Sequence, residues 1–182
     1  MPLPDMNNST VATALAALAD ALEHPAHVET LLVGGAAGML TGELPASRTT
    51  TDCDVMVYAP EDAFEALALA AAAVAERLSL ARGWFNTGAM SLGAGVLPGD
   101  WRGRAAVVLE HESLTVLAAG RRDLIAMKVY AHRAQDLEDL DAMRVRRSEA
   151  GFVRAHLDTL GANPDRVSDA RAVLDSLELI DG

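Results

Sequence analysis

The stretch VGGAAGMLTG (residues 33–42), followed by RTTTDCDV (residues 48–55), decides how this chain is interpreted. It begins at the end of an apolar run, so Gly34 and Gly35 mark a sharp turn from a strand into a short helix. Glycine lets the backbone approach a ligand without a Cβ clash, and a helix N-terminus offers N–H groups to a phosphate. On its own, such a glycine pair is more typical of a tight turn that binds nothing.

The second piece opens the clearest strand of the sequence, DCDVMVY (residues 52–58). Alternation predicts two faces, one with Cys53, Val55 and Val57 and the other with Asp52, Asp54, Met56 and Tyr58. The two carboxylates would lie about 6 to 7 Å apart along the strand. In an interior strand they would repel each other unless they share a cation. Carboxylates without histidine are the ligands that Mg²⁺ (or Mn²⁺) prefers, although a solvated strand edge is the alternative for an isolated Asp-x-Asp.

The loop before the acidic pair adds polar groups to this arrangement. Arg48 supplies a fixed cation, and Thr49, Thr50 and Thr51 supply three hydroxyls immediately upstream of the carboxylates. An arginine beside hydroxyl groups is suited to hold a triphosphate.

Taken together, these residues resemble the signature of the polymerase-β-like nucleotidyltransferase superfamily, in which a Gly-Gly or Gly-Ser turn precedes a strand with an acidic pair. The longer pattern is most similar to the bacterial branch that includes toxins of abortive-infection toxin–antitoxin systems. Proteins of that branch carry a later helix with a lysine followed by an Arg, Asp, Asp run. The chain supplies this run as Lys128, Arg133, Asp136 and Asp139.

The resemblance implies a role for each matching residue. Asp52 and Asp54 would be catalytic and would bind the metal, and a third acid would come from a later strand. Glu110 is the candidate for that acid, with Glu112 on the same strand face. The triphosphate would contact six residues: Gly34, Gly35, Arg48, Thr49, Thr51 and Lys128.

The later acidic residues have less definite roles. By resemblance, Asp136 would fix the geometry of its helix or hold Arg133. A solvated helix face with salt bridges is the alternative for Arg133 and Asp139. The single cysteine, Cys53, is expected to be a small core residue, because one cysteine can form neither an internal disulfide nor a cysteine-based metal site.

Periodicity outside the signature predicts an α+β fold, with a small mixed β-sheet flanked by helices and a C-terminal helical half. Residues 1–120 would form the nucleotidyltransferase-like core, and residues 121–182 would pack on it as part of one structural unit. Helices are expected at about 9–24, 36–42, 61–82, 121–133, 135–147, 149–160 and 165–178. Residues 83–103 have no clear period and are interpreted as a short strand or loop that covers something.

The charge balance limits the possible partners. The chain of 182 residues has a formal net charge of −11, which repels phosphate backbones. Extended contact with RNA would therefore require its arginines to gather on one surface. No apolar run approaches the roughly 18 residues of a membrane span, and no secretion signal is recognisable, so we expect a cytoplasmic protein without a membrane partner.

Three functions follow as hypotheses. The first is a metal-dependent transfer of a nucleoside monophosphate from an NTP to a small molecule, a protein or an RNA end. The second is a non-catalytic member of the same fold that binds a nucleotide or a partner, for example as half of a toxin–antitoxin pair. The third is a structural domain in which the aspartates are simply solvated.

Overall fold

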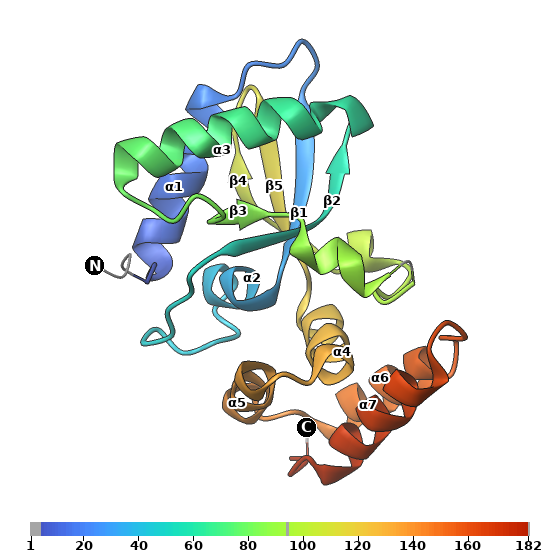
Figure 1. Ribbon diagram of the computed structural model, residues 1–182. Coiled ribbons are helices and arrows are strands. Elements are labelled where there is room, and N and C mark those ends of the chain that lie inside the picture. The colour runs from blue at the N-terminus through green and yellow to red at the C-terminus, as the bar shows by residue number, and fades with distance from the viewer. Residues whose placement is uncertain (1–4, 94, 182) are drawn as a thin grey trace. The chain divides into compact units, whose positions relative to one another are not determined.

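The computed structural model describes residues 5–93 and 95–181 and has the α+β fold that the sequence predicts. Its strands are β1 (Val28–Val33), β2 (Cys53–Ala59), β3 (Phe85–Asn86), β4 (Ala106–Glu110) and β5 (Leu114–Ala118). Its α-helices are α1 (Asn8–Ala21), α2 (Gly34–Leu40), α3 (Phe64–Leu78), α4 (Arg121–Ala131), α5 (Ala134–Met143), α6 (Arg147–Leu157) and α7 (Pro164–Ser176) (Figure 1). No helix in the described part of the chain combines the length and the apolar character that a membrane crossing needs.

The chain divides into two compact units. The first contains the residues up to Ser91 together with Ala105–Ala119, and it holds the whole sheet. The second contains Leu92–Arg104 and the residues from Gly120 onward, with helices α4 to α7. The sequence places the boundary near Arg121, and it does not anticipate that Leu92–Arg104 belongs with the helices.

The first unit is built on a five-stranded mixed sheet with the order β3-β2-β1-β5-β4. The central strand β1 is antiparallel to β2 and parallel to β5, and β2 is parallel to the short edge strand β3. Every residue of β1 except Glu29 is buried, because the strand is covered on both faces. The end of β1 and the start of β2 therefore lie side by side in the interior of the sheet.

The pairing of β1 with β2 contains a β-bulge. Two successive residues of β1 pair with Val55 and Val57, so Met56 between them has no partner. A bulge of this kind reverses the alternation of the residues that follow it. The interpretation that Asp54, Met56 and Tyr58 share one face is therefore wrong, because Tyr58 lies on the face opposite Asp54.

Helix α3 covers the face of β2 that carries Val55 and Tyr58 (Figure 1). The spacing of its apolar residues predicts a buried stripe, and Leu67, Ala71 and Val74 of that stripe are buried. Phe64, expected in the same stripe, is instead 48% exposed.

The second unit is a group of helices around α4, in which every residue from Asp123 to Ala131 is buried. Helix α4 contacts α5, α6 and α7. It ends because His132 adopts the left-handed conformation, with φ of 41°, and Arg144 ends α5 in the same way. Lys128 and Asp136 therefore lie on different helices and not on one continuous face.

Candidate functional site

The glycine turn and the acidic pair meet at one end of the sheet. Gly34 has φ of +68°, a left-handed conformation that glycine adopts readily and that lets α2 begin directly after β1. Val33 pairs with Asp54 across the antiparallel strands, which brings the Asp54 side chain to this turn. A Cβ atom on Gly34 would lie only 3.1 Å from Oδ2 of Asp54. The carboxylate therefore rests directly against the backbone of the turn.

Gly35 is approached in the same way by the loop before β2. A Cβ atom on Gly35 would lie 3.4 Å from Nη2 of Arg48 and 3.4 Å from Oγ1 of Thr50. The Thr50 hydroxyl donates a hydrogen bond to the backbone oxygen of Asp52 at 3.0 Å and lies 3.5 Å from its Oδ1. The two glycines, both aspartates and Arg48 are thus brought together, as the sequence predicts.

Of the three threonines, Thr50 is the one that contacts the turn. Two backbone hydrogen bonds with Met6, at 2.7 and 2.9 Å, hold this buried residue in place. Thr49 instead donates to Oδ2 of Asp5 at 3.3 Å, and Thr51 is exposed. The sequence predicts that Thr49 and Thr51 contact the triphosphate. Thr50 is separated from Asp52 and from Asp54 by an even number of residues, so alternation could have indicated that its side chain shares their face.

Glu110 is not brought to the acidic pair. Across the sheet, Glu110 is in register with Thr115 of β5, Glu29 of β1 and Ala59 of β2. Ala59 is at the end of β2 that is remote from Asp54. Strand β4 is also the opposite edge of the sheet from β3, and Glu110 is exposed. Across the described residues, no three His, Cys, Asp or Glu side chains form a group that could hold a metal ion.

Asn86 stands beside Asp54, where the sequence interpretation named no residue. It pairs with Asp54 across the parallel strands β3 and β2. The backbone N–H of Gly88 donates to Oδ1 of Asn86 at 2.7 Å. A Cβ atom on Gly88 would lie 2.8 Å from this oxygen and 3.8 Å from Oδ1 of Asp54. The two-residue strand is too short for a periodic signal, so only the Asn-Thr-Gly turn chemistry could have indicated it.

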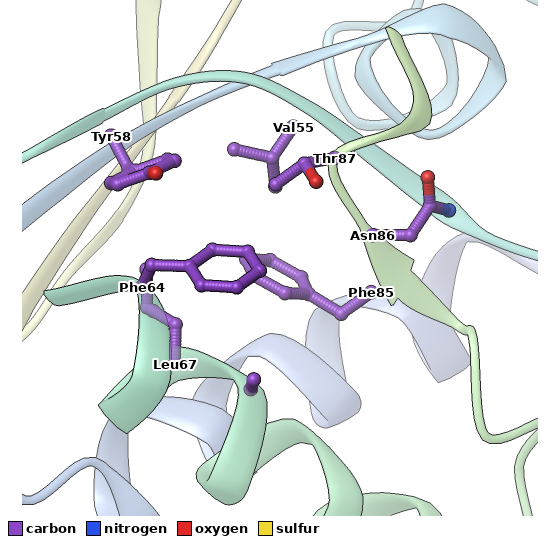
Figure 2. A pocket seen from close by; sticks show the side chains of 8 residues that line it. Val55, Tyr58, Phe64, Leu67, Phe85, Asn86 and Thr87 are labelled. Atoms are coloured by element: carbon purple, nitrogen blue, oxygen red, sulfur yellow. The ribbon is translucent and has the colours of Figure 1, made fainter. Parts of the chain in front are cut away.

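A cavity of about 220 Å³ lies on the other face of β2, beneath α3. Figure 2 shows the rings of Phe64 and Phe85 in this cavity, whereas the amide of Asn86 points away from both rings. Tyr58 lies near Phe64, with 5.8 Å between the ring centroids. The ring of Phe85 therefore points into the cavity, whereas the amide of Asn86, which also borders the cavity, is directed away from the rings.

Cys53 lies between the aspartates in sequence but not in the site. It is fully buried and forms no disulfide, which confirms its expected place in the core. Burial raises the pKa of its thiol, and the negative charges of Asp52 and Asp54 raise that pKa further. The thiol therefore stays protonated and is not suited to act as a nucleophile.

The atoms around the glycine turn that could coordinate a cation are oxygens. They comprise the carboxylates of Asp52 and Asp54, the hydroxyl of Thr50 and the amide oxygen of Asn86. Oxygen ligands with only two carboxylates fit a hard cation such as Mg²⁺, which retains several water molecules and is completed by substrate phosphates. The arrangement could therefore hold a divalent ion together with a phosphorylated ligand.

Lys128 belongs to the second unit, where buried carboxylates surround it. Its Nζ lies 2.6 Å from Oδ2 of Asp139 and 3.5 Å from Oδ1 of Asp136, and all three side chains are almost completely buried. Asp136 also accepts hydrogen bonds from the backbone N–H and the Nε of Arg133, at 3.2 and 2.8 Å, and so caps α5. The expectation that Asp136 holds Arg133 is confirmed, and a solvated Asp139 is ruled out.

Replacement of Gly34 by alanine tests this geometry. Gly34→Ala and Gly42→Ala both place a side chain at a left-handed residue, which costs about 1 to 2 kcal/mol. Only at Gly34 would the new Cβ also press on the Asp54 carboxylate, since nothing lies within 4 Å of the Cβ position of Gly42. We expect urea unfolding to show a larger loss of stability for Gly34→Ala than for Gly42→Ala. Equal losses would contradict the contact with Asp54.

Comparison with known proteins assigns the chain to a family. A search of curated proteins and a search of solved structures both give no match. Residues 11–150 match the model of the family described as nucleotidyltransferase of unknown function (DUF6036). The matched segment contains the Gly34-Gly35 turn, Asp52, Asp54 and helix α4 with Lys128. With the acidic pair at a glycine turn and this match over most of its length, the chain belongs to that family of nucleotidyltransferases.

Proposed function

We propose that the protein transfers a nucleoside monophosphate from an NTP to an acceptor and that Asp52 and Asp54 bind the Mg²⁺ or Mn²⁺ ion for this reaction. The observation that carries the proposal is that the Asp54 carboxylate lies against Gly34, while the Asp52 carboxylate lies beside the Thr50 hydroxyl that contacts Gly35. Such an ion neutralises phosphate charge and polarises the phosphorus that is attacked. The oxygen-only donor set supports this choice of ion.

The remaining residues of the site would position the triphosphate. The guanidinium of Arg48 lies beside Gly35, where it can form charge-assisted hydrogen bonds with phosphate oxygens. The glycines let a phosphate approach the backbone, because no Cβ atom occupies that space. An oxygen of the acceptor would then attack the α-phosphorus in line. The bond to the bridging oxygen would break, pyrophosphate would leave, and the acceptor would lose its proton.

A non-catalytic member of the same fold is the second candidate. Glu110 lies at the far end of the sheet, and the described residues contain no third acid beside Asp52 and Asp54. An enzyme of this superfamily is expected to use a third carboxylate, so the chain would bind a nucleotide or a partner without transfer. A role as half of a toxin–antitoxin pair would belong to this candidate or to the first.

The charges of the second unit favour a compact acceptor over an extended RNA contact. Several of its arginines already form ion pairs: Arg104 with Asp123, Arg121 with Glu149 and Arg147 with Asp181. Their charge is therefore largely compensated, and the whole chain carries −11. We propose a small molecule, a protein side chain or the end of an RNA as acceptor, in preference to a long stretch of nucleic acid.

The proposal is tested by incubation of the protein with each NTP, Mg²⁺ or Mn²⁺, and a cell extract. NTPs labelled at the α-phosphate should transfer label to an acceptor, and NTPs labelled at the γ-phosphate should not, because pyrophosphate leaves. Asp52→Asn is the matched inactive control. Transfer of the γ-label would indicate a phosphotransferase. Absence of any labelled product would favour the non-catalytic candidate.

A further inference from the structure

We propose that Asn86 is the third protein ligand of the site and that its amide oxygen takes the place of a third carboxylate. This inference rests on the proposed function, because it concerns the cation bound by Asp52 and Asp54. The cation would then be held by two charged ligands, Asp52 and Asp54, and one neutral ligand, Asn86. Three features support this role: the strand register, the orientation of the amide and the glycine that lies beside both side chains.

The register places Asn86 next to Asp54. Strands β2 and β3 are parallel neighbours, and Asn86 is the Cα partner of Asp54. Partners in adjacent strands project their side chains to the same face of a sheet. Figure 2 agrees with this arrangement, because the ring of Phe85 points into the cavity, whereas the amide of Asn86, which also borders the cavity, points away from that ring. The amide of Asn86 and the carboxylate of Asp54 therefore emerge side by side.

The orientation of the amide is fixed by the backbone. Oδ1 accepts a hydrogen bond from the N–H of Gly88 at 2.7 Å, and Nδ2 donates to the backbone oxygen of Gly83 at 3.3 Å. Because an N–H group requires an acceptor, the atom facing Gly88 is the oxygen. A carbonyl oxygen has two lone pairs, so one remains available for a cation.

Gly88 keeps the two oxygens close to one another. A Cβ atom at this position would lie 2.8 Å from Oδ1 of Asn86 and 3.8 Å from Oδ1 of Asp54. Any other residue would push the amide away and fill the space between the amide and the carboxylate. Gly34 lies against the other oxygen of the same carboxylate, with 3.1 Å from its Cβ position to Oδ2. The Asp54 carboxylate thus lies between Gly34 and Gly88, and the Asn86 amide also lies beside Gly88.

The neutral charge of Asn86 has a measurable consequence. Two carboxylates and one amide compensate the charge of a divalent cation, whereas three carboxylates would leave an excess negative charge. The number of charged ligands tunes the affinity of oxygen-based cation sites. A site with a neutral third ligand should bind the free cation weakly and depend on the phosphates of the NTP for tight binding.

The test is a calorimetric titration of Mn²⁺ into the full-length protein without nucleotide. Asn86→Asp keeps the size and the acceptor for the Gly88 N–H, loses the hydrogen bond to the Gly83 oxygen, adds a charge, and should tighten binding about tenfold. Asn86→Ala removes the ligand and should weaken binding about tenfold. Asn163→Asp is the matched control, because it adds the same charge at the N-cap of α7 in the second unit. It should leave the affinity unchanged.

The possible outcomes separate this inference from the proposed function. Wild-type affinity in both Asn86 variants, or weaker binding by Asn86→Asp, would overturn the role of Asn86 and leave the role of the aspartates intact. If the wild-type protein bound no Mn²⁺ with or without an NTP, the proposed function would fail as well. Melting curves of each variant identify any loss of folding, and if Asn86→Ala is unfolded, the affinity of Asn86→Asp decides the question alone.

Discussion

Replacement of Asp54 by asparagine is expected to reduce nucleotidyl transfer by at least about 100-fold while the protein remains folded. The Asp54 carboxylate lies against Gly34 on one side and near Gly88 on the other, so its negative charge is located where the cation is proposed to bind. Asparagine has almost the same shape, and the loss of one charge relieves repulsion with Asp52. The melting temperature should therefore stay constant or rise slightly. Label transfer from an α-labelled NTP measures the activity, and a thermal melt measures the folding.

Glu110→Gln is the matched control for this experiment. It also removes one carboxylate, but at the opposite end of the sheet, in register with Ala59 of β2. Transfer should continue at the wild-type rate. A variant Asp54→Asn that unfolded would indicate a structural ion pair in place of a cation site. A strong loss of transfer in Glu110→Gln would restore the role that the sequence interpretation gave to this residue.

Lys128→Met should destabilise the second unit by about 3 to 5 kcal/mol. The substitution leaves the carboxylates of Asp136 and Asp139 without the ammonium group that lies 3.5 and 2.6 Å from them. Both carboxylates are almost completely buried, so their charges would lack compensation by water. Urea unfolding followed by circular dichroism measures the loss.

The double variant Lys128→Met with Asp139→Asn provides the control, since it also removes one of the two carboxylate charges that face the ammonium group. It should recover part of the lost stability. The competing expectation, by resemblance, is that Lys128 contacts the triphosphate. A Lys128→Met protein that kept its stability but showed a higher KM for the NTP would support that expectation and contradict a structural role.

The centre of the candidate site could be predicted from the sequence because its parts are local. The spacing of Asp52 and Asp54 fixes their common face over two residues, before the bulge at Met56 intervenes. Gly34 and Gly35 follow an apolar strand directly, and only a sharp turn fits that position. The antiparallel pairing of β1 with β2 then brings these two short segments together.

Features that depend on pairing between distant strands could not be predicted in this way. Glu110 lies on a strand of the expected type, but its position relative to Asp54 is set by the strand order and the register. Asn86 pairs with Asp54 through a strand of two residues, which leaves no periodic pattern. The face of Tyr58 could not be predicted because a β-bulge has no signal in a run of mostly apolar residues.

The partners of Lys128 depend on where a helix ends. A continuous helix would have placed Lys128 and Asp136 on one face, but the left-handed conformation of His132 ends α4 and begins a new helix. Asp136 and Asp139 then approach Lys128 from α5. The sequence predicts the motif and the two separate helices, but the ion pairs depend on how α5 packs on α4, which no local pattern encodes.

The most direct test of the account is a crystal structure with Mn²⁺ and a non-hydrolysable NTP analogue, with anomalous scattering used to locate the ion. We expect an anomalous peak within about 2.2 Å of carboxylate oxygens from both Asp52 and Asp54, beside Gly34, with the phosphates of the analogue next to it. A nucleotide bound elsewhere, or a peak remote from these two side chains, would contradict it.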